Sequence, residues 1–516
     1  MASNQIWIAL TMIVYLAGMV CIGVWFSRRS ASGASEFYLG GRKLGPLVTA
    51  MSAEASDMSS YLLMGLPGLA YISGIAEAGW TIIGLAVGTY LNFLLVAKRL
   101  RVYSEKLGAI TVPDFFTRRY QDQKHVLSLI AAVVILVFFV PYTASGFKAV
   151  GTLMNSLFGL NYHAAMIIGA AIIISYTVLG GFLAVSVTDL VQSVFMTIAL
   201  IVIVFFGIHM AGGMDNVISN AAALPGYLSM TKGYVQSTNS AGSFDFLSIV
   251  STLAWGLGYF GMPHILLRFM AIRHEDEIKI SRRIASVWVV LSMAVSVLIG
   301  IIGYSVSVAG EIPFFTSSAE SETVMIKLAD LMSRSGVFFA IAAGVILAGI
   351  LAATMSTADS QLLVAASSVS QDIAVTFLGV QLSEKKSIIA ARLTVVAIAV
   401  VSVILAWNPA SSIFRVVSFA WAGFGAAFGP VILLGLFWKK SNKYGAIAGM
   451  ATGGAMVFIW KFCISGLGGV FGIYELLPAF VLALIVNVVV SLATGEPEQS
   501  VTETFDQVKA ACAKQK

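Results

Sequence analysis

Apolar runs of about twenty residues recur along the whole chain, and this feature constrains the fold more than any other. Each run matches a hydrocarbon core roughly 30 Å thick, which a helix of about twenty residues spans. Of the 516 residues, 58% are hydrophobic and only 11% are charged. No stretch between the runs is long enough to bury a core of its own. The sequence therefore predicts an all-α polytopic membrane protein with one membrane domain over residues 1–516.

The positions of the runs predict about thirteen transmembrane helices. The first run follows neither a basic segment nor a small-residue cleavage site, so we expect it to be retained as a span. The predicted spans lie near residues 6–26, 46–73, 79–97, 126–155, 162–180, 186–212, 243–269, 285–309, 336–375, 388–407, 413–438, 444–462 and 475–494.

The distribution of basic residues predicts the orientation of the chain. Most of the 31 Lys and Arg residues fall in segments that share one side of the membrane. By the positive-inside rule, the N-terminus is outside and the C-terminus is cytoplasmic. The net charge of +6 therefore reflects orientation and not nucleic-acid binding. We interpret residues 268–283 as a solvated connector, and Val501, Phe505 and Val508 as one face of an amphipathic tail helix.

The second predicted span contains an unusually polar stretch within residues 50–70. Glu54 and Asp57 lie among serines that include Ser59 and Ser60. A carboxylate at the bilayer centre costs about 2.5–3.5 kcal/mol, so these acids need protein neighbours or a cation. A helix broken at residues 56–60 would present carbonyl and hydroxyl oxygens to an ion or substrate. The alternative is a re-entrant or packing segment whose acids are simply hydrogen-bonded.

The ninth predicted span carries oxygen atoms on two adjoining helical faces. Ala353, Ser356 and Thr357 share one face, and Ser356, Asp359 and Ser360 share the next. Sodium is a hard ion that prefers oxygen ligands, so the faces suit two cation positions or one position and its supporting groups. Alternatively, the hydroxyls bond the carbonyl four residues back or let helices approach closely.

Further candidates lie beside breaks or at the end of a span. Asp189 is an acid near the inner end of the sixth span. Tyr142 follows a proline in the fourth, and Trp255 and Tyr259 share a helical face beside Gly258. We interpret these aromatic residues as a substrate wall, while core or lipid contact remains the alternative for any single ring.

The pattern of breaks predicts an internal repeat. The second span is interrupted at residues 56–60, and the seventh contains Trp-Gly-Leu-Gly at 255–258. Each break opens a block of five spans, and paired broken helices are typical of inverted-repeat transporters. We therefore expect repeats at 46–212 and 243–438, an extra helix and loop at 1–45, and two helices with a tail at 439–516. Glycines within 421–430 predict either a hinge or close helix packing.

No pattern of an enzyme or of a cofactor site is present in the sequence. The three cysteines are far apart, and the five histidines form no metal-binding pair. No nucleophile–base motif or appended catalytic domain is present. We therefore expect a protein that is not an enzyme, has no cofactor and has no obligate protein partner.

Four motifs resemble those of a known family: SAEASDMSSYLLMGLPG, AWGLGYFGMPHILLRFMA, MSTADSQLL and SFAWAGFGAAFGP. They are similar to the sodium/solute symporter family, and most similar to its sodium/proline symporters, from about Phe37 through the eleventh span. The resemblance implies a LeuT-type 5+5 inverted repeat with one extra N-terminal and two C-terminal helices. It also implies a multi-pass protein of the bacterial cytoplasmic membrane, with sodium as the coupling ion.

The resemblance further implies roles for individual residues. The main sodium site would use the carbonyls of Ala55, Met58 and Ala353 with the hydroxyls of Ser356 and Thr357. Asp57 matches an acid needed for sodium-dependent transport. Asp189, Ser356, Asp359 and Ser360 match a region that holds a second sodium in some relatives. The substrate pocket would involve Ser59, Ser60, Tyr142, Trp255, Gly258 and Tyr259.

The sequence as a whole predicts sodium-driven import of a small zwitterion, with L-proline favoured. Glu54 and Ser60 stand where the proline-transporter pattern has glycines, and Met262 stands where it has glutamine. The alternative is therefore another small amino acid or organic solute carried by the same mechanism. A passive channel or a membrane sensor is a less favoured class, because the broken helices point to a midplane site.

Overall fold

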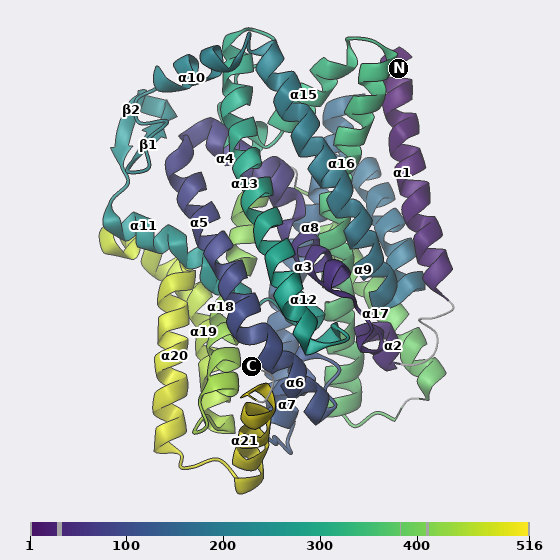
Figure 1. The fold of residues 1–516 in the computed structure, drawn as a ribbon, viewed down its shortest axis with the longest axis vertical. Coiled ribbons are helices and arrows are strands. Elements are labelled where there is room, and N and C mark those ends of the chain that lie inside the picture. The colour runs from purple at the N-terminus through teal and green to yellow at the C-terminus, as the bar shows by residue number, and fades with distance from the viewer. Residues whose placement is uncertain (1–2, 28–33, 382, 409–411, 514–516) are drawn as a thin grey trace.

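The computed structural model describes residues 3–27, 34–381, 383–408 and 412–513 (Figure 1). Helices dominate these residues, as the apolar runs predict. The first half comprises α1 (Ser3–Ser27), α2 (Ala34–Leu39), η2 (Gly40–Arg42), α3 (Pro46–Ser60), η3 (Tyr61–Gly65), α4 (Leu66–Ser73), α5 (Ile75–Leu91), η4 (Asn92–Ala97), α6 (Lys98–Leu107), α7 (Val112–Arg119), α8 (Val126–Phe158), α9 (Tyr162–Met210) and α10 (Met214–Ala222). A small hairpin of β1 (Lys232–Val235), η5 (Gln236–Thr238) and antiparallel β2 (Ser240–Ser243) follows.

The second half is again helical. It comprises α11 (Phe246–Leu253), η6 (Ala254–Phe260), α12 (Pro263–Ala271), η7 (Glu275–Glu277), α13 (Ile278–Val308), α14 (Ser318–Ser321), α15 (Val324–Ser333), α16 (Val337–Ser367), η8 (Ser368–Phe377), α17 (Glu384–Leu405), α18 (Ile413–Phe437), α19 (Lys443–Ile459), η9 (Trp460–Ile464), η10 (Ser465–Leu467), η11 (Gly469–Phe471), α20 (Leu476–Ala493) and α21 (Gln499–Ala513).

Ten helices of the described residues are long and apolar enough to cross a membrane, or eleven if the bent pair at 246–271 counts as one span. The predicted number of thirteen is therefore not confirmed. Two features explain the difference. The 49-residue helix α9 contains both the fifth and the sixth predicted spans, with non-helical backbone only at Gly181. The second predicted span is divided among α3, η3 and α4, and its polar residues lower its hydropathy.

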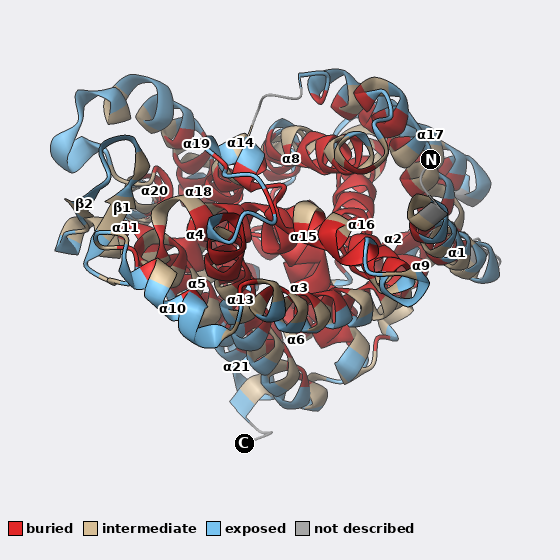
Figure 2. Cartoon of the chain, turned by 90° about the horizontal axis from the view of Figure 1, so that it is seen from above, coloured by how far each residue is buried: buried red, intermediate tan, exposed pale blue. Residues whose placement is uncertain are grey.

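The long helices run roughly along one axis of the molecule (Figure 1). The start of α1, α10 and the hairpin lie toward one end of this axis, and α21 lies toward the other. Buried residues gather at the centre, where α3 and α16 lie, and exposed residues line the periphery (Figure 2). Large apolar side chains such as Trp25 and Phe205 are more than 70% exposed on the outer helices, as lipid contact requires.

Both predicted helix breaks are present. In α3 the backbone leaves the helical region at Ser59, where φ is 46° and ψ is −169°. The seventh predicted span consists of α11, the 3-10 turn η6 and α12, and its axis bends by 45°. Irregular backbone at membrane depth is tolerated only where protein or a cavity surrounds it. These two interruptions therefore mark the interior position of a site.

The glycines of 421–430 serve close packing in a continuous helix, α18. A Cβ atom added at Gly423 would lie 2.3 Å from the Phe138 ring, and one at Gly425 would lie 2.8 Å from the Gly258 Cα. Of the two predicted interpretations, the structure thus supports helix packing at these positions.

Two predictions about the chain outside the spans have different outcomes. The tail forms α21 with Val501, Phe505 and Val508 buried, as predicted. The interpretation of 268–283 as a solvated connector is wrong at its start, because Arg268 belongs to α12 and is 0% exposed. The apolar residues around Arg268 continue the bent span, and Arg268 is buried because it has an acidic partner.

Candidate functional site

The broken helix α3 meets α16 through the oxygen atoms predicted to hold sodium. The Ser356 hydroxyl donates to the Ala55 carbonyl at 2.8 Å and lies 3.2 Å from the Ala353 carbonyl. The Thr357 hydroxyl donates to the same Ala353 carbonyl at 3.2 Å. Four of the five predicted ligands are thus joined in one buried cluster. Met58 lies one turn after Ala55 and lines the adjacent cavity.

Asp57 faces the second broken helix. Its carboxylate accepts a hydrogen bond of 2.5 Å from the Tyr259 hydroxyl on η6. The Tyr142 hydroxyl on α8 donates to the Asp57 carbonyl at 3.2 Å and lies 3.5 Å from the Ser59 hydroxyl oxygen. The break at Ser59 exposes the carbonyl at 57, which explains why the Tyr142 hydroxyl finds an acceptor there.

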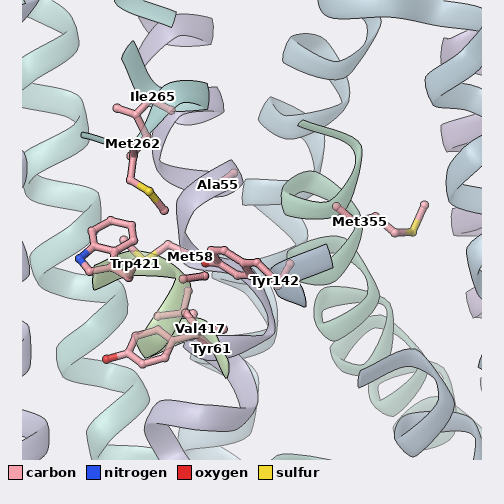
Figure 3. Close-up of a cluster of buried hydrophobic side chains, with 14 of the residues drawn as sticks. Ala55, Met58, Tyr61, Tyr142, Met262, Ile265, Met355, Val417 and Trp421 are labelled. Atoms are coloured by element: carbon pink, nitrogen blue, oxygen red, sulfur yellow. The ribbon is translucent and has the colours of Figure 1, made fainter. Parts of the chain in front are cut away.

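A small cavity of about 10 Å³ lies between the two breaks. This is roughly the space that one water occupies. Figure 3 shows Met58 between Trp421 and Tyr142, with Tyr61 and Val417 nearby. The cavity wall is mainly apolar and aromatic apart from the acid, and its lining residues are Asp57, Met58, Tyr61, Leu85, Tyr142, Trp255, Met293, Val417 and Trp421.

Gly258 has no side chain, and this leaves space for the Trp421 ring beside the small cavity. A Cβ atom at this position would lie 1.9 Å from the Trp421 Nε1 atom. That indole nitrogen donates to the Trp255 carbonyl at 2.7 Å, and the Trp421 ring meets the Tyr259 ring edge-on at 5.0 Å. Gly258 therefore lets Trp421 lie against η6. Met262 caps the start of α12 and is fully buried beside this group (Figure 3).

A layer of aromatic rings separates the small cavity from a vestibule of about 830 Å³. The Trp255 ring lies between those of Tyr61 and Tyr474, at 5.7 and 5.2 Å between centroids. Phe414, at the start of α18, contacts the Tyr61 and Trp255 rings at 5.7 and 5.6 Å. Trp255 lines both the cavity and the vestibule. Moving this layer would join the two spaces.

Backbone hydrogen bonds join the segment before α3 to the C-terminal end of α12. Leu44 and the residues after α12 exchange backbone hydrogen bonds, from Leu44 N to Ala271 O at 3.2 Å and from Arg273 N to Leu44 O at 2.9 Å. The Arg101 guanidinium on α6 donates to the Ile272 carbonyl at 2.6 Å. The site is thus covered by backbone contacts at one end and by aromatic side chains at the other.

The acids predicted for a second sodium position lie around a buried arginine. Arg268 Nη2 is 3.0 Å from the Asp189 carboxylate and 2.6 Å from the Ser360 hydroxyl. Ser52 donates to the same carboxylate at 2.6 Å. Asp359 stands apart from this ion pair and accepts a hydrogen bond of 2.9 Å from Tyr176. Among the described residues Ser356 forms no hydrogen bond to this group, so the shared role of its hydroxyl stays a prediction.

Glu54 and Ser60 have no hydrogen-bond partner among the described residues. Both carboxylate oxygens of Glu54 and the hydroxyl of Ser60 are buried. Glu54 points about 200° around the helix from Ser52, away from the arginine cluster. Ser60 lines a second, nearly filled polar space with Ser59, Tyr142 and Thr357.

A buried acid outside the spans holds the start of α18. The Glu322 carboxylate accepts hydrogen bonds from the Ser412 hydroxyl at 2.8 Å and from the backbone N–H groups of Ile413 and Phe414 at 3.2 Å each. Burial raises the pKa of Glu322 above its ordinary value, and these hydrogen bonds oppose the shift. A Cβ atom at Gly68 would lie 2.8 Å from the Glu322 nitrogen, so α4 lies directly against this acid.

We expect Glu322→Ala to impair the solute uptake that the sequence predicts, because Phe414 in the aromatic layer depends on this cap. Hydrogen bonds to a charged group contribute about 1.5–3 kcal/mol. Initial uptake rates should therefore fall about tenfold while expression persists. The control is Glu320→Ala, since Glu320 is exposed and caps only the short helix α14. Equal rates for Glu322→Ala and the control would contradict this role.

Several site residues were not found from the sequence. Arg268, Ser52, Tyr176 and Glu322 come from elements far apart in the chain, and each acts through a long-range contact. A signal existed for Arg268, which stands alone among apolar residues in the bent span. An ionisable residue in such a place is a functional candidate by default.

Two broken helices that meet at a buried site, covered at both ends, are typical of secondary transporters of the membrane. The sequence model of the sodium:solute symporter family matches residues 37–453. The chain belongs to this family. Relatives of the family are transporters, so the expectation of a protein that is not an enzyme agrees with the family found.

Three bacterial relatives are similar over nearly the whole chain. The osmoregulated proline transporter OpuE of Bacillus subtilis is 40% identical, covering 96% of this chain and 97% of the relative. The high-affinity proline transporter PutP of the same organism is 42% identical over 95% and 98%. Sodium/proline symporter 2 of Staphylococcus saprophyticus is 40% identical over 96% and 95%.

Solved structures show the same fold. A Na⁺-coupled sialic acid symporter in a substrate-bound outward-open state has a TM-score of 0.77 at 18% identity, covering 96% of this chain and 99% of that one. The nucleobase-cation-symport-1 transporter Mhp1 has a TM-score of 0.54 at 15% identity, covering 91% and 98%. The predicted fold class, a LeuT-type helical membrane protein, is confirmed.

Proposed function

We propose that the protein imports L-proline together with sodium by alternating access. The names of three relatives at 40–42% identity support proline as the substrate. The observation that carries the proposal is the meeting of the two broken helices. There the oxygen cluster of Ala55, Ser356 and Thr357 lies next to the Asp57–Tyr259 contact and the aromatic cavity.

Sodium would bind where the break in α3 faces α16. The carbonyls of Ala55, Met58 and Ala353 and the hydroxyls of Ser356 and Thr357 are oxygen ligands of the kind a hard cation prefers. Asp57 supplies a nearby negative charge. Since the Asp57 carboxylate also accepts from Tyr259 on the other broken helix, an ion at this place would bias the relative position of α3 and η6.

A second cation position beside Asp189, Asp359 and Ser360 is part of the proposal. Asp189, Arg268 and Asp359 are all buried, and Arg268 forms its ion pair with Asp189, so the Asp359 carboxyl has no ion pair among the described residues. One oxygen each of Asp189 and Asp359 has no hydrogen-bond partner among the described residues. A buried charge of this kind needs compensation.

The substrate would lie between the aromatic side chains of Tyr142, Trp255 and Tyr259, near Ser59, Ser60 and Gly258. Proline is small and largely apolar, and the wall of this cavity is largely apolar. Glu54, Ser60 and Met262 favour a second candidate, another small amino acid or organic solute, because they alter the surroundings of the site.

The topology completes the proposal. Residues 46–212 and 243–438 would form the two inverted repeats, with α3 and η6 as corresponding broken helices. Residues 1–45 would add one helix, and 439–516 would add two helices and a tail. In the bacterial cytoplasmic membrane the N-terminus would be outside and the C-terminus inside, as the basic residues predict.

Uptake by purified protein in proteoliposomes tests the function. Labelled proline and a panel of amino acids and organic solutes are supplied with an inward sodium gradient, with a potassium gradient, or with neither. We expect concentrative proline uptake only with sodium. Concentrative uptake of a different solute would replace proline by the second candidate. Uptake that only equilibrates proline would instead indicate a channel.

We expect Trp255→Ala and Tyr259→Ala each to raise the Km for proline about tenfold or more. Burying an apolar side chain contributes roughly 1.5–3 kcal/mol, and each 1.4 kcal/mol is tenfold in affinity. Trp407→Ala is the matched control, because Trp407 is 52% exposed and lines neither the cavity nor the vestibule. Unchanged Km values with sodium coupling intact would show that the pocket lies elsewhere; Trp255→Phe covers a folding failure of the alanine variant.

A further inference from the structure

A groove of about 650 Å³ lies on the outer face of the helices, separate from the transport site. It runs between the second half of α9 and the first half of α13, and its volume is in the range of small-molecule sites. The surface that lines the groove is almost entirely apolar. Its lining residues are Met51, Thr197, Leu200, Ile201, Arg283, Ile284, Val287, Trp288, Leu291, Ser292 and Val295.

The groove has a buried floor and exposed walls. Met51, Leu200 and Ser292 are at most 7% exposed, whereas Val287 and Leu291 are about 60% exposed. The Trp288 indole donates to the Thr197 hydroxyl at 3.0 Å, which joins α13 to α9 along the groove. Both helices are long and apolar enough to span the membrane, so the walls face lipid and not water.

The length of the groove corresponds to one leaflet. Its α13 residues run from Arg283 to Val295, a stripe about 18 Å long at 1.5 Å per residue. One leaflet of a hydrocarbon core roughly 30 Å thick is about 15 Å. A single extended acyl chain therefore matches the groove from end to end.

One end of the groove carries a single basic residue. Arg283 lies at this end, is exposed, and takes part in none of the ion pairs of the described residues. Lys279 lies one turn before it on the same helix but does not line the groove. Arg282 is directed elsewhere, with its guanidinium 5.1 Å from the Tyr90 ring on α5. A basic residue near the membrane surface attracts anionic lipid head groups.

We propose that this groove is a binding site for one anionic phospholipid, with an acyl chain along α9 and α13 and the phosphate group at Arg283. The floor residue Met51 precedes Ser52, which donates to Asp189 in the buried ion pair. The acyl chain thus contacts the broken helix α3 from outside, close to the residues that hold it to α9. Bound lipid stabilises this contact between α3, α9 and α13.

Native mass spectrometry of the full-length protein, extracted with phosphatidylglycerol or with phosphatidylcholine present, tests the site. We expect one phosphatidylglycerol to be retained in preference to phosphatidylcholine. Arg283→Gln should lower the retained fraction about fivefold, the factor expected for one basic residue at an anionic bilayer surface. Lys279→Gln removes the same charge one turn away, outside the lining, and should retain the lipid.

A groove-filling variant tests the position of the acyl chain. Leu291→Trp should reduce retention of phosphatidylglycerol although Arg283 is intact, and Ile201→Trp does the same from the opposite wall. Sodium-driven uptake confirms that each variant is folded. Equal loss in Arg283→Gln and Lys279→Gln, or full retention in both tryptophan variants, would overturn the proposal. Equal retention of the two lipids by the parent would overturn it as well.

Discussion

Removing the Ser356 or the Thr357 hydroxyl should raise the sodium concentration for half-maximal uptake about tenfold or more. Each hydroxyl supplies one oxygen to the cluster where α16 meets the break in α3. Interactions with a charged group contribute about 1.5–3 kcal/mol, and 1.4 kcal/mol corresponds to a factor of ten. Ser356→Ala and Thr357→Ala therefore act on sodium activation more strongly than on packing.

The measurement is initial proline uptake over a range of sodium concentrations. Proline affinity should fall mainly when sodium is limiting, because the coupling between two ligands is reciprocal. Ser367→Ala is the matched control, since its hydroxyl donates only to the Val364 carbonyl of the same helix. Lower expression with unchanged sodium activation in both variants would mean that the hydroxyls serve packing alone.

Breaking the buried ion pair should cost the protein several kcal/mol of stability. Arg268 and Asp189 are both 0% exposed. Removing one partner of such a pair typically destabilises by about 3–5 kcal/mol, because a buried charge is left without compensation. Arg268→Met and Asp189→Leu should each lower the unfolding temperature in detergent by many degrees, measured with a dye that reports unfolding.

The double variant distinguishes the effect of an unpaired buried charge from the effect of the changed side-chain shape. Arg268→Met with Asp189→Leu should be more stable than either single variant, since replacing both partners leaves no unpaired charge between them. Repeating the measurement with choline in place of sodium isolates any stabilisation by bound cation. Additive losses in the double variant would show that the two side chains do not interact as the structure indicates.

The sequence was sufficient for those features that depend on neighbouring residues. The break at Ser59 and the turn at Trp255–Gly258 follow from local composition, and so does the shared face of Ala353, Ser356 and Thr357. The partners of these residues were predictable only through the family resemblance. Helix packing in three dimensions decides that Asp57 meets Tyr259, and no pattern within either segment specifies this contact.

The arginine cluster shows where local reasoning fails. Charge counting placed Arg268 with the basic residues after it, because orientation rules treat all Lys and Arg near a span end alike. Its guanidinium instead lies inside the bundle, where Asp189 from α9 and Ser360 from α16 surround it. The predicted number of thirteen spans also rests on local composition, and the structure has ten or eleven candidate spans. A single glycine, Gly181, bends α9 without ending it, and hydropathy does not register that difference.

In the substrate pocket that we propose, the contact between Gly258 and Trp421 limits how new specificities can evolve. Any side chain at position 258 would displace the Trp421 indole, which donates to the Trp255 carbonyl. A single substitution of Gly258 would therefore disrupt the packing of Trp421 against η6 and could not simply change the shape of the pocket. Leu85, Met293 and Val417 line the same cavity with side chains of their own. Variation in substrate preference is therefore more accessible through these three positions, and a selection for new substrates should recover changes there while position 258 stays glycine.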